Sequence, residues 1–136
     1  MKLLTHLNFG GNCEEAFRYY ETHLGGQISM IQRVRDLPSN VPPPPGSPDA
    51  VIHARISIGG FELIGNDVPP SYFQPIRSAY LYLSLDTIEE AERAYAALME
   101  GGEVGIPMGE SFFALRFAQL RDQFGTLWSI LCQPPE

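Results

Sequence analysis

Alternating apolar and polar positions predict strands along much of the chain. In residues 79–85, the apolar Leu81, Leu83 and Leu85 alternate with Tyr80, Tyr82 and Ser84, which is the pattern of a half-buried strand. Strands are predicted over residues 3–9, 27–35, 51–58, 61–66, 79–85, 103–108, 112–120 and 126–132. The Gly59-Gly60 pair predicts a tight hairpin between two of them, because both positions of a two-residue turn favour positive φ.

Two further segments carry apolar residues at helical spacing and therefore predict amphipathic helices. The first stripe is Cys13, Ala16, Phe17, Tyr20 and Leu24, and the second is Ile88, Ala91, Tyr95 and Leu98. Asn12 and Thr87 precede the stripes, each followed three residues later by Glu, so both are predicted to be helix N-caps in capping boxes. Gly25 and Gly101 are predicted to end the helices in a left-handed conformation.

The two helices belong to an internal repeat. Residues 14–20 read EEAFRYY and residues 89–95 read EEAERAY, and each segment is followed by a Gly-Gly pair. Each half then reads strand, helix, three strands. This order predicts an α+β fold of two βαβββ modules, residues 1–68 and 78–133, in a single domain that spans residues 1–136. Two unrelated amphipathic helices with glycine ends remain the alternative to a repeat.

Residues 36–49, DLPSNVPPPPGSPD, interrupt the first module. Consecutive prolines exclude a helix or a central strand and favour extended polyproline geometry. The segment is either a plain surface connection or, as long loops often are, a functional lid or dimer arm. It is not a domain boundary, since strands of one module lie on both sides.

Charge and composition argue against nucleic acid and membranes as binding partners. The net charge is −7 and Lys2 is the only lysine, so the chain is expected to repel nucleic-acid backbones. No apolar run reaches the roughly 20 residues needed to cross a membrane. The N-terminus does not resemble a secretory signal, which predicts a cytoplasmic protein. Cys13 and Cys132 have no metal-ligand spacing and are interpreted as small core residues.

The doubled pattern resembles the vicinal oxygen chelate superfamily, which includes glyoxalase I, bleomycin-resistance proteins and extradiol dioxygenases. Within it the chain is most similar to the PhnB-like branch, often described as 3-demethylubiquinone methyltransferase-like. The residues that carry the resemblance are Leu7-Asn8-Phe9, residues 11–16, Tyr20, Gly25-Gly26, His53-Ala54, Asn66-Asp67 and, in order, GGEVGIPM, Phe113, Arg116-Phe117 and DQFGTLW. It implies a curved mixed sheet around a cavity and a homodimer. A methyltransferase finds no support in the residues, because Gly10-Gly11 lacks the rest of a nucleotide-binding G-x-G-x-x-G fingerprint.

Strand parity selects the side chains expected to line that cavity. The polar side chains opposite the apolar strand positions are His6, His53, Arg55, Glu62, Tyr80, Tyr82 and Arg116, with Trp128 or Ser129 from the last strand. Arg55, Tyr80, Tyr82, Arg116 and Trp128 are the predicted ligand-binding residues. Trp128 is nevertheless interpreted first as core, and an ion pair of Arg116 with Glu62 or another acid is favoured over a ligand contact. His53 is either a hydrogen-bonded structural residue or a general base.

The resemblance also implies one divalent metal ion held by four side chains, from the first and last strands of each module. His6 and Glu62 match two positions, although counting back from Tyr20 without a gap gives Thr5 in place of His6. In the second module the positions fall on Tyr80 or Leu81 and on Ser129, which are poor metal ligands. The incomplete set favours a cavity that works without a metal.

Three functions follow from these patterns. The first is binding of a small organic ligand in the cavity between the modules. The second is a metal-dependent lyase, isomerase or dioxygenase acting through His6 and Glu62. The third is a degenerate module that serves dimer assembly.

Overall fold

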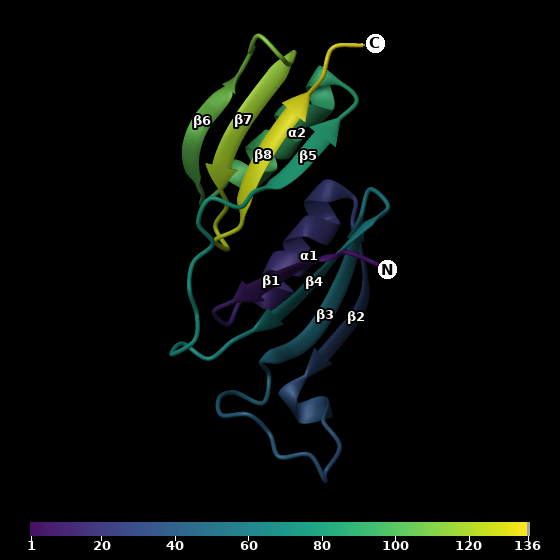
Figure 1. Ribbon diagram of the computed structural model, residues 1–136, viewed down its shortest axis with the longest axis vertical. Coiled ribbons are helices and arrows are strands. Elements are labelled where there is room, and N and C mark those ends of the chain that lie inside the picture. The colour runs from purple at the N-terminus through teal and green to yellow at the C-terminus, as the bar shows by residue number, and fades with distance from the viewer. Residues whose placement is uncertain (136) are drawn as a thin grey trace. The chain divides into compact units, whose positions relative to one another are not determined.

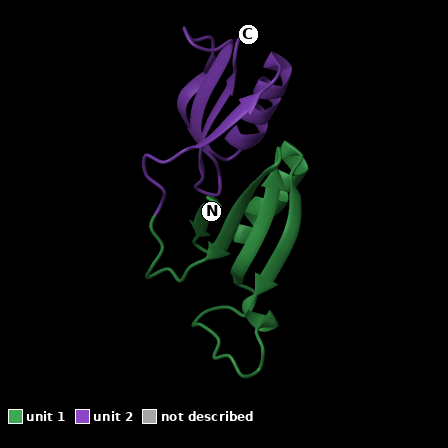
Figure 2. Ribbon diagram, turned by 45° about the vertical axis from the view of Figure 1, so that its right-hand side comes forward, with its two compact units in different colours: residues 1–74 green, residues 75–136 purple. Residues whose placement is uncertain are grey.

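In the computed structural model, which describes residues 1–135, the chain forms two compact units (Figure 2). Residues 1–74 make the first unit and residues 75–136 the second. Each unit has the element order strand, helix, three strands, as the internal repeat predicted. The chain is thus an α+β protein with two helices and two four-stranded mixed sheets. That both units make one domain stays a prediction.

The first unit places one helix on one face of its sheet (Figure 1). Its elements are β1 (Thr5–Phe9), α1 (Cys13–Leu24), β2 (Gln27–Arg33), the 3₁₀ turn η1 (Val34–Asp36), β3 (Val51–Ile58) and β4 (Phe61–Asp67). The strand order is β1-β4-β3-β2, with β1 and β4 parallel and the other pairs antiparallel. Gly59 and Gly60 both have positive φ, at 57° and 84°, and form the predicted two-residue hairpin.

The second unit repeats this arrangement. Its elements are β5 (Leu81–Leu85), α2 (Ile88–Met99), β6 (Glu103–Gly109), β7 (Arg116–Arg121) and β8 (Leu127–Cys132). The strand order β5-β8-β7-β6 is the same as in the first unit, again with one parallel pair, β5 and β8. Neither helix of the described residues is long and apolar enough to cross a membrane.

Each unit buries its core between its helix and one sheet face. In the first unit the predicted helix stripe is buried except for the half-buried Leu24, and the Phe17 ring meets Phe9 of β1 edge-on at 5.9 Å between centroids. The main sheet contributions are Leu7, Ala54, Ile56 and Leu63. In the second unit the corresponding buried residues are Ala91, Ala94 and Leu98 from α2 and Ala118, Leu120 and Ile130 from the sheet.

At the helix ends, one of the two predicted N-caps and both predicted C-terminal glycines are confirmed. Thr87 caps α2, accepting a hydrogen bond from Glu90 N at 3.1 Å, and Gly25 and Gly101 have left-handed φ. The prediction that Asn12 caps α1 is wrong, because its side chain makes no capping bond. The first amide of α1 donates instead to a carboxylate from β4, Asp67 Oδ1, at 2.9 Å from Cys13 N.

Strand boundaries differ where a local turn ends the pairing. The strand predicted to reach residue 35 ends at Arg33, because the chain turns into η1 and Arg33 N donates to the Asp36 carboxylate. The strand predicted from residue 112 begins at Arg116. Before it, the Ser111 hydroxyl accepts from the amides of Phe113 and Ala114, which bends the chain.

The proline-rich segment connects η1 to β3 within the first unit (Figure 1). Its base is tied to the unit by Val34 N donating to Ala50 O and Arg35 N donating to Pro48 O, both at 2.9 Å. Arg35 and Asp49 also form an ion pair across the base. The segment is therefore an excursion within one unit, as predicted.

Candidate functional site

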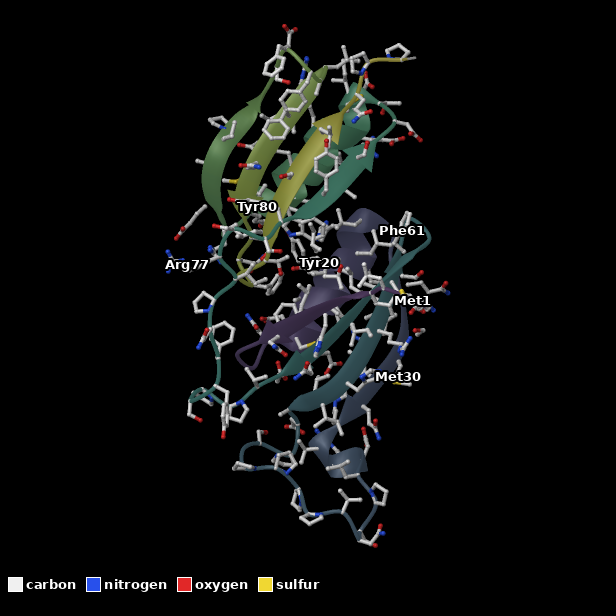
Figure 3. The ribbon with its side chains drawn as sticks, viewed as in Figure 1. Met1, Tyr20, Met30, Phe61, Arg77 and Tyr80 are labelled. Carbon is white, nitrogen blue, oxygen red and sulfur yellow. The ribbon has the colours of Figure 1, made fainter. Side chains whose placement is uncertain are left out.

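The sheet of the first unit carries a polar cluster on the face away from α1. Strand register places His6 beside Ile64 and Arg55 beside Ile64, so side chains of the same parity share this face. The cluster comprises His6, Asn8, His53, Arg55, Glu62 and Asn66. Met30 of β2 pairs with Arg55 and stands at the margin of the same face (Figure 3). The grouping of His6, His53, Arg55 and Glu62 follows the sequence-based expectation.

Arg55 is the centre of this cluster. Its Nη1 donates to Glu62 Oε2 at 3.0 Å and its Nε donates to His53 Nε2 at 3.3 Å. Lys2 Nζ lies 3.9 Å from the same Glu62 oxygen. Since Nε2 of His53 accepts a hydrogen bond, the neutral imidazole carries its proton on Nδ1. His53 is therefore hydrogen-bonded within the cluster, as expected if it is a structural residue and not a general base.

His6, and not Thr5, lies on the helix-free face. Thr5 pairs with Leu63 and shares the parity of the buried Leu7, whereas His6 has the opposite parity. The Nε2 atom of His6 hydrogen-bonds Asn66 Oδ1. An amide oxygen only accepts, so Nε2 carries the proton and Nδ1 keeps the lone pair of the neutral ring.

The donor set of this unit does not fit a catalytic metal ion. His6 and Glu62 share the face, but Glu62 is held by two cations and the His6 Nε2 by Asn66. Catalytic metal sites need about three protein ligands. Among residues 1–135, no three His, Cys, Asp or Glu side chains are gathered in a metal-binding group.

In the second unit, Tyr80 and Tyr82 share strand parity and are 43% and 60% exposed. Tyr80 stands just before β5 (Figure 3). Beside Tyr82, Ser129 of β8 accepts a hydrogen bond from Gln119 Nε2 at 3.0 Å. At the position where the family resemblance implies a metal ligand in the second module, the chain thus has the Ser129 hydroxyl in place of a carboxylate. The ligand-binding roles of both tyrosines stay predictions.

The expectation that Arg116 lies opposite the helix is wrong. Arg116 has the parity of the buried Ala118 and Leu120, and its Nε donates to Glu92 of α2 at 3.1 Å. A second carboxylate, that of Glu110, lies 3.8 Å from its Nη1. The prediction assigned the strand face with the bulkier Phe117 to the core. In the structure, α2 packs against β7, and the small Ala118 is the buried residue of the opposite face.

Trp128 is core, as its first interpretation held. It is 2% exposed, and its indole Nε1 donates to Asp122 Oδ2 at 2.9 Å. The other oxygen of Asp122 accepts from the amides of Phe124 and Thr126, which fixes the turn before β8. A buried indole that is already hydrogen-bonded has a structural task here.

Sequence reasoning gave no role to Asn66 and Asp67, which it noted only as part of the resemblance. Asn66 positions His6, and Asp67 joins two elements by accepting from Cys13 N and from Val51 N, both at 2.9 Å. Their signal was weak, because an acidic residue at a strand end is usually a turn residue and its partners lie far away in sequence.

Comparison with known proteins agrees with the doubled fold. The model of a family described as 3-demethylubiquinone-9 3-methyltransferase matches residues 1–131. Protein YjdN of Escherichia coli (strain K12) is 30% identical over 96% of this chain and 94% of its own length.

Solved structures extend the comparison. Protein PA1353 from Pseudomonas aeruginosa has a TM-score of 0.87 and 36% identity, with 98% of both chains covered. A putative 3-demethylubiquinone-9 3-methyltransferase, PhnB protein, from Bacillus cereus has a TM-score of 0.83 and 28% identity, with 97% of this chain and 99% of that one covered.

More distant structures share the fold alone. They include a glyoxylase/bleomycin resistance protein/dioxygenase domain from Frankia sp. EAN1pec, with a TM-score of 0.69 and 13% identity over 98% of this chain and 92% of that one. The fosfomycin resistance protein FosX from Listeria monocytogenes has a TM-score of 0.66 and 9% identity over 98% and 93%. The glyoxylase/bleomycin resistance/dioxygenase and FosX structures thus share the fold of this chain. Because the family model spans almost the whole chain, the chain belongs to the PhnB-like 3-demethylubiquinone-9 3-methyltransferase family.

Proposed function

We propose that this protein binds a small organic anion, a carboxylate or phosphate-type compound, at the polar cluster around Arg55. The observation that carries the proposal is the convergence of Arg55, His53 and Lys2 with Glu62 on one helix-free sheet face. A guanidinium has five N–H donors, and two of those of Arg55 are used by Glu62 and His53. The remaining donors suit a planar or tetrahedral oxyanion.

The charge of the cluster supports an anion. Lys2 and Arg55 outweigh the one carboxylate, Glu62, so this face is locally positive on a chain of net charge −7. An anion is attracted to this positive face and is repelled by the negative surface elsewhere on the protein. The imidazoles of His6 and His53 add hydrogen-bonding groups on the same face, which fit a ligand with more than one oxygen.

The ion pair between Arg55 and Glu62 does not prevent Arg55 from binding an anion. The Arg55–Glu62 pair is partly exposed, with side-chain exposures of 34% and 30%. Such a pair is worth about 0–1 kcal/mol, so an anion can displace Glu62 from Arg55 at small cost. Glu62 then acts as a competitor that sets the affinity.

The test is calorimetric titration of the full chain with malonate and with malonamide, its neutral analogue. Malonate is expected to bind and malonamide to bind about two- to fivefold more weakly, because a partly exposed ion pair contributes about 0–1 kcal/mol. Arg55→Ala should weaken malonate binding by at least the same factor and remove the preference for malonate over malonamide. Arg93→Ala removes the same charge from an exposed position on α2 and should leave binding unchanged. Equal binding of the two compounds, or full binding by Arg55→Ala, would contradict the proposal.

The homodimer, which the family resemblance implies, and cytoplasmic residence, which the N-terminal sequence predicts, stay predictions. Light scattering tests the first, since a dimer has twice the 15.1 kDa mass of one chain.

A further inference from the structure

A cavity of about 190 Å³ lies in the first unit at the base of the proline-rich segment. Three stretches wall it: the β1–α1 turn, the returning end of the proline-rich segment, and the chain that follows β4. Its lining residues are mainly small or apolar, and comprise Gly10, Gly11, Val34, Pro44, Pro45, Gly46, Ser47, Ala50, Ile52, Asp67, Val68, Pro69 and Pro70. Sequence reasoning did not predict this cavity.

The interior of the cavity favours an apolar group. Asp67 is the one charged residue of the lining, and both of its oxygens already accept backbone hydrogen bonds, from Cys13 and Val51. The first amide of α1 is thereby satisfied, so the helix N-terminus offers no free anion site there. An engineered apolar cavity of about 150 Å³ accepts benzene, so about 190 Å³ suits one ring.

An acidic cavity of about 400 Å³ adjoins the apolar one, and the two share Gly11 and Asp67 in their linings. Its other charged residues are Glu14, Glu15 and Asp49. Arg33 neutralises Glu14, with contacts of 2.6 Å to both carboxylate oxygens.

Two carboxylates of this region are not neutralised. Arg35 pairs with Asp49, but Glu15 and Asp67 form no ion pair among residues 1–135. The mouth of the apolar cavity therefore faces net negative charge. A cationic group is attracted there and an anion is repelled.

The wall made by Pro44 and Pro45 is conformationally restricted. Prolines lose little conformational entropy when a ligand fixes them. The segment is tied at its base, whereas its tip is held among the described backbone bonds by Val41 N donating to Pro38 O. Gly46, between tip and base, has a φ of 123°, a conformation that glycine adopts without a steric penalty.

We propose that this pair of cavities binds a single-ring organic amine, with the ring in the apolar cavity against Pro44, Pro45 and Ile52 and the ammonium group in the acidic cavity near Glu15 and Asp67. The site lies beside the proline-rich segment and uses none of the polar cluster around Arg55. It is independent of the organic-anion site proposed above.

Ligand-observed NMR on the full chain tests the proposal with benzylamine, benzyl alcohol and benzoate as probes. Benzylamine is expected to bind, benzyl alcohol to bind about two- to fivefold more weakly, and benzoate at least about tenfold more weakly, from one exposed charge interaction gained or reversed. Benzoate binding as tightly as benzylamine would overturn the proposal.

Variants locate the site. Ala50→Phe fills the apolar cavity and should abolish benzylamine binding, whereas Ala96→Phe, at an exposed position of α2, should not. The double change Pro44→Ala with Pro45→Ala leaves the core untouched and should weaken binding several-fold. Glu15→Gln should weaken benzylamine and leave benzyl alcohol unchanged.

The two proposed sites are distinguished by testing each ligand on the variant that alters the other site. Arg55→Ala should leave benzylamine binding intact, and the proline variant should leave malonate binding intact. Wild-type affinity for benzylamine in the folded proline variant, or loss of benzylamine binding in Arg55→Ala, would show that the ring does not occupy this cavity.

Discussion

Replacing Asp67 by alanine should destabilise the first unit substantially, because one carboxylate joins three elements. Its oxygens accept from Cys13 N at the start of α1 and from Val51 N at the start of β3, and both donor residues are at most 1% exposed. Loss of a helix cap costs about 1 kcal/mol. An unsatisfied buried amide adds about 1–3 kcal/mol. The expected loss in the free energy of unfolding is therefore about 3 kcal/mol.

Urea denaturation followed by circular dichroism measures this loss, and the Asn12→Ala variant is its matched control. Asn12 occupies the position that the sequence favours for the cap, but its side chain makes no capping bond, so its replacement should cost less than about 0.5 kcal/mol. In Asp67→Ala, the amides of Cys13 and Val51 should also lose protection from hydrogen exchange before the rest of the core. A larger cost for Asn12→Ala than for Asp67→Ala would refute the reasoning.

Three further predictions concern the same unit. Gly65→Ala should cost about 1–3 kcal/mol in a thermal melt, because the added Cβ would lie 2.6 Å from Phe17 Cζ and force the core to shift; an unchanged melting temperature would contradict this packing. Hydrogen bonds from Arg33 lower the pKa of Glu14, so its stabilising contribution is complete above the ordinary value of 4.5 and is lost as pH falls through the lowered folded value. Denaturation from pH 7 to 2 should show a shallower acid loss for Glu14→Gln than for the wild type. Burial raises the pKa of the Cys13 thiol, so a disulfide reagent at pH 8 should modify it only as fast as the protein unfolds, and rapid native-state labelling would count against its burial.

Local patterns in the sequence predicted the features that depend on neighbours in the chain. The alternation of residues 79–85, the Gly59-Gly60 hairpin and the Thr87 cap each involve residues within a few positions of one another, and the structure confirms all three. The repeat extended these local features to the order of elements, which the two identical strand orders confirm.

The failures arose where a distant partner decides the outcome. Asn12 has the right residue type for a cap, but Asp67, 54 residues away, takes the amide of Cys13. The face of Arg116 was misassigned because residue size suggested the core side, whereas α2 approaches closely over Ala118. The members of the polar cluster around Arg55 were predicted, since strand parity sorts the faces of a sheet, but the hydrogen-bond partners within the cluster depend on side-chain conformations that strand parity does not define.

The most direct test of the proposed binding function follows the three histidine imidazoles by NMR during titration with malonate. His6 and His53 lie in the polar cluster, whereas His23 lies in the last turn of α1 and stacks near Tyr19, which makes it an internal control. If malonate binds at the cluster, the His6 and His53 signals should shift saturably, His23 should not shift, and Arg55→Ala should show a much weaker response. Shifts confined to His23, or signals of His6 and His53 that stay fixed while malonate binds, would contradict the proposed site.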